Sequence, residues 1–292
     1  MTDGIVVVDK PAGLTSHDVV ARMRRLAGTR RVGHAGTLDP MATGVLVLGV
    51  DKATRLLAHL TLTDKEYIAT IRLGESTDTD DAEGAIIASC SAQHLDEARV
   101  RAAMRPLTGE IMQVPSSVSA IKIDGQRAYT RARAGETVTL PARPVTVSRF
   151  EIQAWRGVGE RVDVDVAVAC SSGTYVRALA RDLGASLDVG GHLTALRRTR
   201  VGPFTIDLAR TLEDLAALDD PVTLTLADAV RATMPVRDVD ADEARALSYG
   251  KSLAESGRSG THGAIGPDGT VVALLVEQDG RAKPIVVFEA AG

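Results

Sequence analysis

Six consecutive apolar residues, Val45–Val50 (VLVLGV), are the feature that most constrains the fold. The run is too short for a typical buried helix and is rich in β-branched valine, so it predicts a strand that is covered on both faces. Ile5–Val8 (IVVV) has the same character and is followed by Pro11 and Gly13, which predict a turn. The chain is therefore expected to fold around a buried sheet.

Helical and strand patterns alternate through the first 230 residues. Apolar side chains at helical spacing predict helices that follow Ser16, follow Asp96 and cover residues 176–187, with Ser16 as the cap of the first helix. Alternating apolar and polar residues predict strands at Tyr67–Leu73 and Val162–Ala169. Interleaved helices and strands indicate an α/β or α+β fold, but the patterns do not give the order of the strands.

Two regions differ from this pattern. Residues 124–144 are polar and contain Gly, Pro and Arg, so we expect an exposed insertion there. After Pro235, apolar runs at Val271–Val276 and Ile285–Phe288 predict strands of a small β-rich terminal module. A length of 292 residues is consistent with about two domains, and we predict the boundary between residues 232 and 233.

Composition indicates an ordinary folded protein in a reducing compartment. Hydrophobic residues make up 45% of the chain and charged residues 25%, which argues against disorder, collagen and coiled coil. Cys90 and Cys170 stand far apart with no partners at metal-ligand spacing, so a disulfide scaffold is not expected. The acidic N-terminus lacks the layout of a signal peptide, and no apolar run approaches the roughly 20 residues of a membrane span. We expect a cytoplasmic protein that does not enter a membrane.

Charge is distributed unevenly around a formal net charge of −4. Residues 1–35 carry six basic side chains against three acidic ones, and residues 122–161 carry eight against four, whereas residues 207–244 carry three against ten. Most of the basic residues are arginine, whose planar guanidinium suits two-point contacts with phosphate. These stretches predict one basic face for a polyanion, with solvated helix faces as the alternative.

Several common chemistries lack their sequence motifs. The six histidines are scattered, and the chain contains no HExxH motif, no phosphate-binding loop, no GxGxxG and no GxSxG. Residues 78–84 (DTDDAEG) space their carboxylates vaguely like a calcium loop but lack its glycine and its distal glutamate, so we expect a solvated turn. No metal and no nucleotide cofactor is expected.

One carboxylate stands among glycines and small residues, in a stretch expected to be a loop over Gly28–Gly44. Asp39 lies within residues 33–46 (GHAGTLDPMATGVL), where Pro40 restricts its backbone and the flanking glycines let a ligand approach closely. The pattern predicts a fixed, partly desolvated and reachable carboxylate. A simple Asp-Pro turn is the alternative.

Two other stretches carry side chains suited to the same site. Residues 170–177 (CSSGTYVR) place Arg177 at the start of a helix, where its guanidinium is a suitable counter-ion that would keep Asp39 ionised. Pairing of Arg177 with Asp182 or with solvent is the alternative. Tyr67, in the strand that begins Lys-Glu-Tyr, could stack on a base, although a strand tyrosine is more often part of the core.

Together these stretches resemble the tRNA pseudouridine-55 synthases of the TruB type. Besides GHAGTLDPMATGVL and CSSGTYVR, the resemblance rests on collinear matches at residues 9–16 (DKPAGLTS), 65–67 (KEY), 113–115 (QVP), 119–122 (SAIK), Gly125, Tyr129 and 196–204 (LRRTRVGPF). Ser116 and Val118 depart from the family, which often has a proline and an aromatic residue there. The departures put local packing near the insertion in doubt, and not the chemistry.

The resemblance implies a fold and a reaction. It implies a catalytic domain over residues 1–232 with a central mixed, largely antiparallel sheet flanked by helices, a thumb-like insertion at about 124–144 and a PUA-like RNA-binding domain over 233–292. The implied reaction converts uridine 55 in the T-loop of tRNA to pseudouridine, by base flipping and without metal, redox chemistry or cofactor. The implied partner is the T-arm stem-loop of tRNA, and nothing in the sequence suggests an obligate dimer, so we expect a monomer.

The resemblance also implies roles for individual residues. Asp39 would be the essential carboxylate, which attacks the sugar or the base or takes a proton from the sugar. Arg177 would hold and tune it, and Tyr67 would stack on the flipped uracil and take part in proton transfer. The remaining expected substrate-binding residues are Tyr175 and Leu196 in the pocket, His34 in the space that the base vacates (or as an ordinary surface histidine), and Lys10 and Lys122 on phosphates.

Two competing functions remain at this point. One is a non-catalytic RNA-binding or tRNA-chaperone protein that keeps the scaffold. The other is a synthase that acts on ribosomal RNA or on another tRNA position, or one that needs a guide RNA. An intact set of Asp39, Arg177 and Tyr67 argues against the first.

Overall fold

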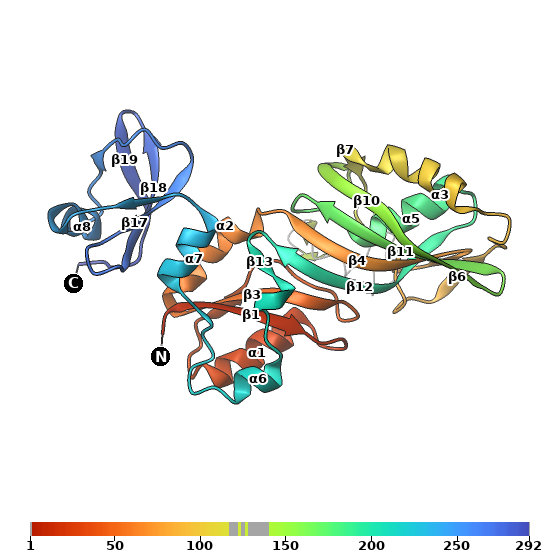
Figure 1. Cartoon of the computed structure of the whole chain (residues 1–292), viewed down its shortest axis with the longest axis horizontal. Coiled ribbons are helices and arrows are strands. Elements are labelled where there is room, and N and C mark those ends of the chain that lie inside the picture. The colour runs from red at the N-terminus through yellow and green to blue at the C-terminus, as the bar shows by residue number, and fades with distance from the viewer. Residues whose placement is uncertain (1, 117–121, 124–125, 128–139, 292) are drawn as a thin grey trace. The chain divides into compact units, whose positions relative to one another are not determined.

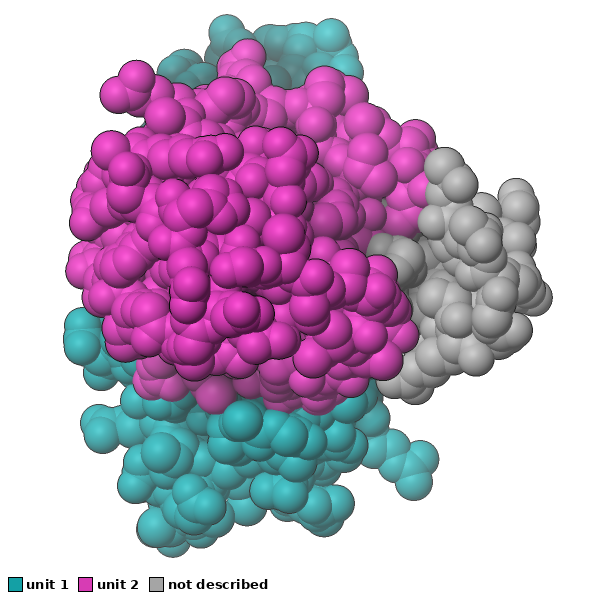
Figure 2. Space-filling view, turned by 90° about the vertical axis from the view of Figure 1, so that its right-hand side faces the viewer, with its two compact units in different colours: residues 1–38, 45–61, 202–292 teal, residues 39–44, 62–201 magenta. Residues whose placement is uncertain are grey.

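The computed structural model describes residues 2–116, 122–123, 126–127 and 140–291, with only the backbone described at 122–123 and 126–127. The Lys122 side chain and most of the predicted insertion at 124–144 therefore lie outside the described residues. The chain divides into two compact units, coloured separately in Figure 2: unit 1 comprises residues 1–38, 45–61 and 202–292, and unit 2 comprises residues 39–44 and 62–201. Figure 1 labels the elements of both.

Unit 2 is built on an antiparallel sheet with the strand order β12–β4–β11–β10–β7. These strands cover Gly191–Val201, Lys65–Leu73, Arg161–Cys170, Arg143–Val158 and Gly109–Gln113 respectively. Thr43 and Gly44 pair in parallel with Arg197 and Arg198 of β12. The sheet is thus mixed and largely antiparallel, which confirms the fold class that the resemblance implied.

Two helices cover this sheet. Helix α5 (Val176–Ser186) packs against β12 and β4, and α3 (Glu97–Met104) packs against α5 and β10. Asp96 caps α3 through a hydrogen bond from the backbone N–H of Arg99, as the sequence pattern predicted. The other described elements of unit 2 are the hairpin strands β5 (Glu75–Thr77) and β6 (Ile86–Ser89), the 3-10 helix η2 (Arg105–Leu107), and the short strands β8 (Lys122–Ile123) and β9 (Gln126–Arg127).

In unit 1 the two apolar runs form buried strands, as predicted, and the structure shows that these strands are neighbours in the sheet. β1 covers Gly4–Lys10, and β3 covers Thr43–Val50, of which residues 45–50 belong to this unit. Its other elements are η1 (Asp51–Leu56), α2 (Leu57–Thr61), β13 (Phe204–Thr205), η3 (Ile206–Leu208), α6 (Leu212–Ala216), β14 (Leu224–Thr225) and α7 (Leu226–Thr233).

Two local predictions in unit 1 are wrong in detail. Helix α1 (Ser16–Leu26) is capped by Thr15, whose hydroxyl accepts a hydrogen bond from the Asp18 N–H, and not by Ser16. Ser16 is buried instead and serves a different purpose, described below. The expected loop over residues 28–44 also contains a short strand, β2 (Val32–His34), because its backbone pairs with the apolar strand β3.

The C-terminal residues form the predicted β-rich module. Its sheet has the order β15–β17–β18–β19–β16, with strands at Val236–Asp238, Thr261–Ile265, Val271–Gln278, Arg281–Val287 and Leu253–Ala254. Helix α8 (Ala241–Ser248) closes a small core that includes Leu247, Leu253 and Leu275. None of the helices in the described part of the chain is long and apolar enough to cross a membrane.

Candidate active site

Asp39 lies at the first position of the 39–44 segment of unit 2, directly after Leu38. Ser16 fixes Leu38 by two hydrogen bonds, because its hydroxyl donates to the Leu38 carbonyl at 3.1 Å and accepts from the Leu38 N–H at 2.8 Å. The Asp39 carbonyl accepts a hydrogen bond from Ala42 at 3.1 Å, which closes a turn. The Asp39 side chain is 35% exposed, so the turn presents a carboxylate that a ligand can reach.

Arg177 is the partner of this carboxylate. It lies in the first turn of α5, its side chain is only 5% exposed, and its Nε and Nη2 atoms lie 3.1 and 3.2 Å from the two carboxylate oxygens of Asp39. This two-point geometry fixes orientation as well as charge. The alternative partner, Asp182, is bound by Arg181 at 2.8 Å.

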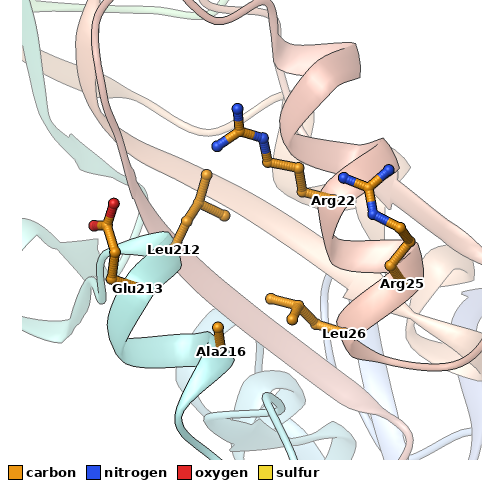
Figure 3. Close-up of a pocket in the computed structure, with 6 residues that line it drawn as sticks. All are labelled: Arg22, Arg25, Leu26, Leu212, Glu213 and Ala216. Atoms are coloured by element: carbon orange, nitrogen blue, oxygen red, sulfur yellow. The ribbon is translucent and has the colours of Figure 1, made fainter.

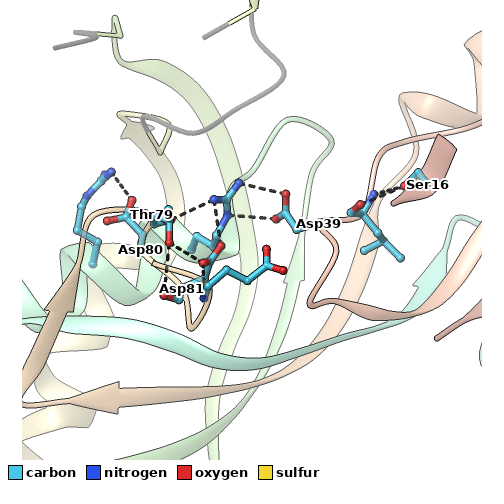
Figure 4. Close-up of polar contacts among 9 residues, drawn as sticks. Ser16, Asp39, Thr79, Asp80 and Asp81 are labelled. Carbon is cyan, nitrogen blue, oxygen red and sulfur yellow. Dashed lines mark hydrogen bonds and ion pairs between the residues drawn. The ribbon is translucent and has the colours of Figure 1, made fainter. Parts of the chain in front are cut away.

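The sequence analysis missed the second partner of the guanidinium. Nη1 of Arg177 lies 3.2 Å from Oδ2 of Asp81 and 3.0 Å from the carbonyl oxygen of Thr79 (Figure 4). The Asp81 side chain is only 3% exposed, and its other oxygen accepts hydrogen bonds from the Thr79 hydroxyl at 2.6 Å and the Glu83 N–H at 3.0 Å. The expectation of a solvated turn at 78–84 is therefore wrong, because this turn carries a buried anion.

One helical turn further along α5, a second arginine binds the same acidic turn. Arg181 lies 3.2 Å from Oδ2 of Asp80 and donates a hydrogen bond to the Val114 carbonyl at 2.7 Å. Burial raises the pKa of Asp80 above its ordinary value, although hydrogen bonding from Ser116 and the charge of Arg181 act in the opposite direction. The turn is thus held to α5 at two points, which fixes the position of Asp81 beside Arg177.

Tyr67 occupies the inner face of β4, where it is only 7% exposed. Burial raises the pKa of its phenol above the usual value, and the charge of Asp39 acts in the same direction. The charge of Arg198 and a hydrogen bond with it oppose this rise. The charge of Asp39 thus disfavours ionisation of the Tyr67 phenol.

Tyr175 and Leu196 also belong to unit 2. Tyr175 is the N-cap residue of α5, and Gln113 holds its backbone on both sides: the Tyr175 N–H donates to Oε1 at 2.8 Å and the Tyr175 carbonyl accepts from Nε2 at 3.1 Å. Leu196 is 7% exposed and lies opposite Ala69, two residues beyond Tyr67. Unit 2 therefore contains five predicted residues whose side chains are described: Asp39, Tyr67, Tyr175, Arg177 and Leu196.

The other predicted residues lie elsewhere. The Lys10 side chain is fully buried, and its Nζ donates to the carbonyls of Pro11 at 2.9 Å and Leu14 at 2.6 Å. It stabilises the turn after β1, so the expectation that it contacts phosphate is wrong for this structure. His34 lies in β2 of unit 1, with its ring edge-on to that of His17 at 5.6 Å between centroids.

Unit 1 contains a pocket of about 390 Å³ between α1 and α6 (Figure 3). It is lined by Arg22, Arg25, Leu26, Leu212, Glu213 and Ala216. The two arginines come from the basic N-terminal stretch, and both are exposed. Their side chains are therefore available to an anionic ligand.

Across the described residues, no group of three or more His, Cys, Asp or Glu side chains is arranged to hold a metal ion. The carboxylates of Asp39 and Asp81 share the guanidinium of Arg177. Such an arrangement presents an anionic oxygen of fixed direction to a ligand.

Comparison with protein families gives three consecutive matches. Residues 24–176 match the family described as TruB family pseudouridylate synthase (N terminal domain). Residues 177–231 match the tRNA pseudouridylate synthase B C-terminal domain, and residues 234–289 match tRNA Pseudouridine synthase II, C terminal. The matches together extend over most of the chain.

Individual proteins are similar over nearly the whole length. A tRNA pseudouridine synthase B of Thermobifida fusca (strain YX) is 62% identical over 292 residues, which cover 99% of each chain. One of Nocardia farcinica (strain IFM 10152) is 61% identical over 290 residues, covering 99% of this chain and 94% of that protein. Among solved structures, a chain of a Cbf5–Nop10–Gar1 complex matches with a TM-score of 0.75 and 26% identity, covering 98% of this chain and 85% of that one.

Proposed function

The chain belongs to the TruB family of pseudouridine synthases, and from that premise we propose how its residues perform the reaction. The protein is an isomerase that converts uridine 55 of tRNA to pseudouridine. The reaction breaks the bond between C1′ of the ribose and N1 of the base and joins C1′ to C5. It also moves one proton, because C5 loses a hydrogen and N1 gains one.

Asp39 supplies the anionic oxygen for this rearrangement. The observation that carries the assignment is the two-point contact of its carboxylate with Arg177 at 3.1 and 3.2 Å, while the side chain remains 35% exposed. The guanidinium favours the ionised form and sets the direction of the oxygens. The exposed part of the carboxylate is the part that a substrate can meet.

The target uridine reaches Asp39 by leaving its stack. Flipping a base costs about a few kcal/mol, and stacking on an aromatic side chain returns about 1–3 kcal/mol. Tyr67, which belongs to the same compact unit as Asp39, serves as this platform. Tyr175 and Leu196 line the pocket, and His34 takes the place that the base vacates.

The RNA partner is the T-arm stem-loop of tRNA. Exposed arginines such as Arg22 and Arg25, together with Lys122 and the insertion at 124–144, contact its phosphates. Residues 233–292 act as a PUA-like accessory domain on the same RNA, following a catalytic domain over residues 1–232. The enzyme works as a monomer in the cytoplasm.

The decisive experiment is Asp39→Asn, which keeps the shape of the side chain and removes its charge. We expect pseudouridine formation on tRNA to be abolished while the dissociation constant of the tRNA stays within about threefold. Turnover near the wild-type rate would refute the assignment of Asp39. The same assay on an isolated T-arm stem-loop, followed by mapping of the modified position, separates this function from a guide-dependent or ribosomal-RNA synthase.

The pseudouridine assay also distinguishes the enzyme from the non-catalytic RNA-binding or chaperone protein considered from the sequence. Such a protein would bind tRNA and form no pseudouridine in its wild-type form. The accessible, arginine-bound Asp39 favours the enzyme, because a binding scaffold has no use for an anionic side chain in front of a polyanion.

A further inference from the structure

Arg198 is one of the largest fully buried side chains of the protein, with only 1% of its surface exposed. It lies on β12 directly opposite Tyr67 of β4, and on its other side it pairs with Gly44 of β3. Residues directly opposite one another in an antiparallel pair point to the same face of the sheet. The hydrogen bond between Arg198 and Tyr67 agrees with this register.

The hydrogen-bonding chemistry of the two groups fixes the direction of this contact. A guanidinium carries only donors, whereas a phenol carries one donor and also accepts. Arg198 therefore donates and the Tyr67 oxygen accepts. The hydroxyl proton of Tyr67 therefore points away from Arg198. In this way Arg198 determines the direction in which Tyr67 can donate its proton.

The surroundings keep the Tyr67 phenol neutral, and Arg198 opposes this effect. Burial raises the pKa of Tyr67 above its ordinary value, so the hydroxyl keeps its proton at neutral pH. The cation and the hydrogen bond of Arg198 oppose that rise, whereas the charge of Asp39 contributes to it. Cys170 adds no charge at pH 7, because burial raises the pKa of its thiol to about 11. Arg198 is thus the group that makes ionisation of Tyr67 less costly.

We propose that Arg198 is a positioning residue that acts through the Tyr67 hydroxyl, orienting its proton and stabilising the phenolate while that proton moves from Tyr67 to the base and back. This inference rests on the proposed function of the site. It assigns to Arg198 no contact with the substrate.

The phenol of Tyr67 both donates the proton that N1 gains and accepts the proton that C5 loses. When the bond from C1′ to N1 breaks, its electron pair stays on N1, and Tyr67 donates its proton to that nitrogen. Rotation of the base exchanges the positions of N1 and C5. After C1′ joins C5, the Tyr67 phenolate takes the hydrogen of C5 as a proton, and the phenol is restored. Arg198 stabilises the phenolate between the two transfers, and no other reactant is needed.

A purely structural role for Arg198 makes a different prediction. Its backbone pairs with Gly44, where an added Cβ would lie only 2.1 Å from the Arg198 carbonyl oxygen, so the strand junction is closely packed. An arginine that only supports this junction would affect the reaction equally whether or not Tyr67 carries a hydroxyl. A residue that acts through the hydroxyl would not.

The test is therefore a double-mutant cycle with Arg198→Lys or Arg198→Met in the wild-type and Tyr67→Phe backgrounds. The readouts are single-turnover release of tritium from C5 of the target uridine, at saturating tRNA, and the dissociation constant of the tRNA. With Tyr67 present, we expect Arg198→Met to lower the rate roughly 10- to 100-fold and Arg198→Lys less, since a hydrogen bond to a charged group is lost or weakened. In the Tyr67→Phe background, we expect either change to alter the rate less than about twofold.

Arg200→Met is the matched control. Arg200 lies on the same strand, but a register shift after Arg198 places it opposite Glu66, with which it pairs at 2.9 Å. Glu66 and Tyr67 are neighbours on β4 and therefore point to opposite faces of the sheet. Its removal should leave the single-turnover rate unchanged. Circular dichroism and thermal unfolding check each variant, and if Arg198→Met does not fold, Arg198→Lys in both backgrounds carries the cycle.

Each outcome has a defined meaning. Equal losses in the wild-type and Tyr67→Phe backgrounds would overturn the inference, because Arg198 would then act on structure alone. Wild-type turnover in Tyr67→Phe would also overturn it while leaving the role of Asp39 intact. A different result would refute the proposed function, namely an Asp39→Asn enzyme that is still active.

Discussion

Substituting Asp81 by Asn tests whether the buried carboxylate fixes the guanidinium that holds Asp39. The change keeps the shape of the side chain and removes its charge, so Arg177 loses a buried charged partner at 3.2 Å. A hydrogen bond to a charged group contributes about 1.5–3 kcal/mol. If that free energy serves to orient Arg177 in the transition state, the single-turnover rate falls roughly 10- to 150-fold, at about 1.4 kcal/mol per factor of ten.

The measurement is single-turnover pseudouridine formation at saturating tRNA, with tRNA affinity determined separately. Affinity should change less than about twofold, because the Asp81 side chain is only 3% exposed and does not reach the RNA. Asp163→Asn is a matched control, since Asp163 forms another two-point pair, with Arg72 at 2.8 and 2.9 Å, in the same unit. A wild-type rate for a folded Asp81→Asn enzyme would refute the orienting role, and an equal loss in the control would show that the effect is not specific.

Two further predictions concern protonation and RNA binding. Burial, assisted by the charge of Arg198, lowers the pKa of Lys65 from 10.5 to about 8, so between these pH values the unfolded chain binds more protons and the free energy of unfolding rises with pH. Lys65→Met removes the ionisable group, so it should abolish this rise of roughly 3 kcal/mol in the free energy of unfolding. If urea denaturation gave the wild type and the variant the same dependence of that free energy on pH, the prediction would be contradicted. Replacing Arg22 and Arg25 together by Ala should reduce the slope of log affinity against log salt by about 1.8 if both contact phosphate; an unchanged slope would place α1 outside the RNA interface.

The sequence was informative where local pattern and local structure coincide. The apolar run at 45–50 became part of the buried strand β3, and the alternation at Tyr67–Leu73 became β4. Strand order was not predictable in the same way, because it depends on pairings between distant segments. The parallel contact of Arg198 with Gly44 joins residues more than 150 positions apart, and no local period records it.

The errors at the site have the same origin. Asp81 looked like a solvated turn residue because its neighbours are acidic, yet Arg177, 96 positions away, binds it in the interior. The available signal in the sequence was the presence of Thr79 and Gly84 on either side of Asp81. In the structure the two residues pack closely, since an added Cβ at Gly84 would lie 2.3 Å from the Thr79 hydroxyl. Lys10 looked like a phosphate contact, but two carbonyls of the following turn bind its ammonium group.

Sharing one guanidinium between two carboxylates suits the chemistry that Asp39 performs. An isolated Arg177–Asp39 pair would leave a buried cation without compensation at the moment when the Asp39 oxygen turns to the substrate, and uncompensated buried charge is strongly destabilising. Asp81 removes that cost, because it stays bound to Arg177 and its own remaining oxygen is held by Thr79 and Glu83. Asp39, at 35% exposure, is therefore the partner that can leave Arg177 at the lower cost in free energy. The buried carboxylate keeps the cation in place so that the exposed one is available to react.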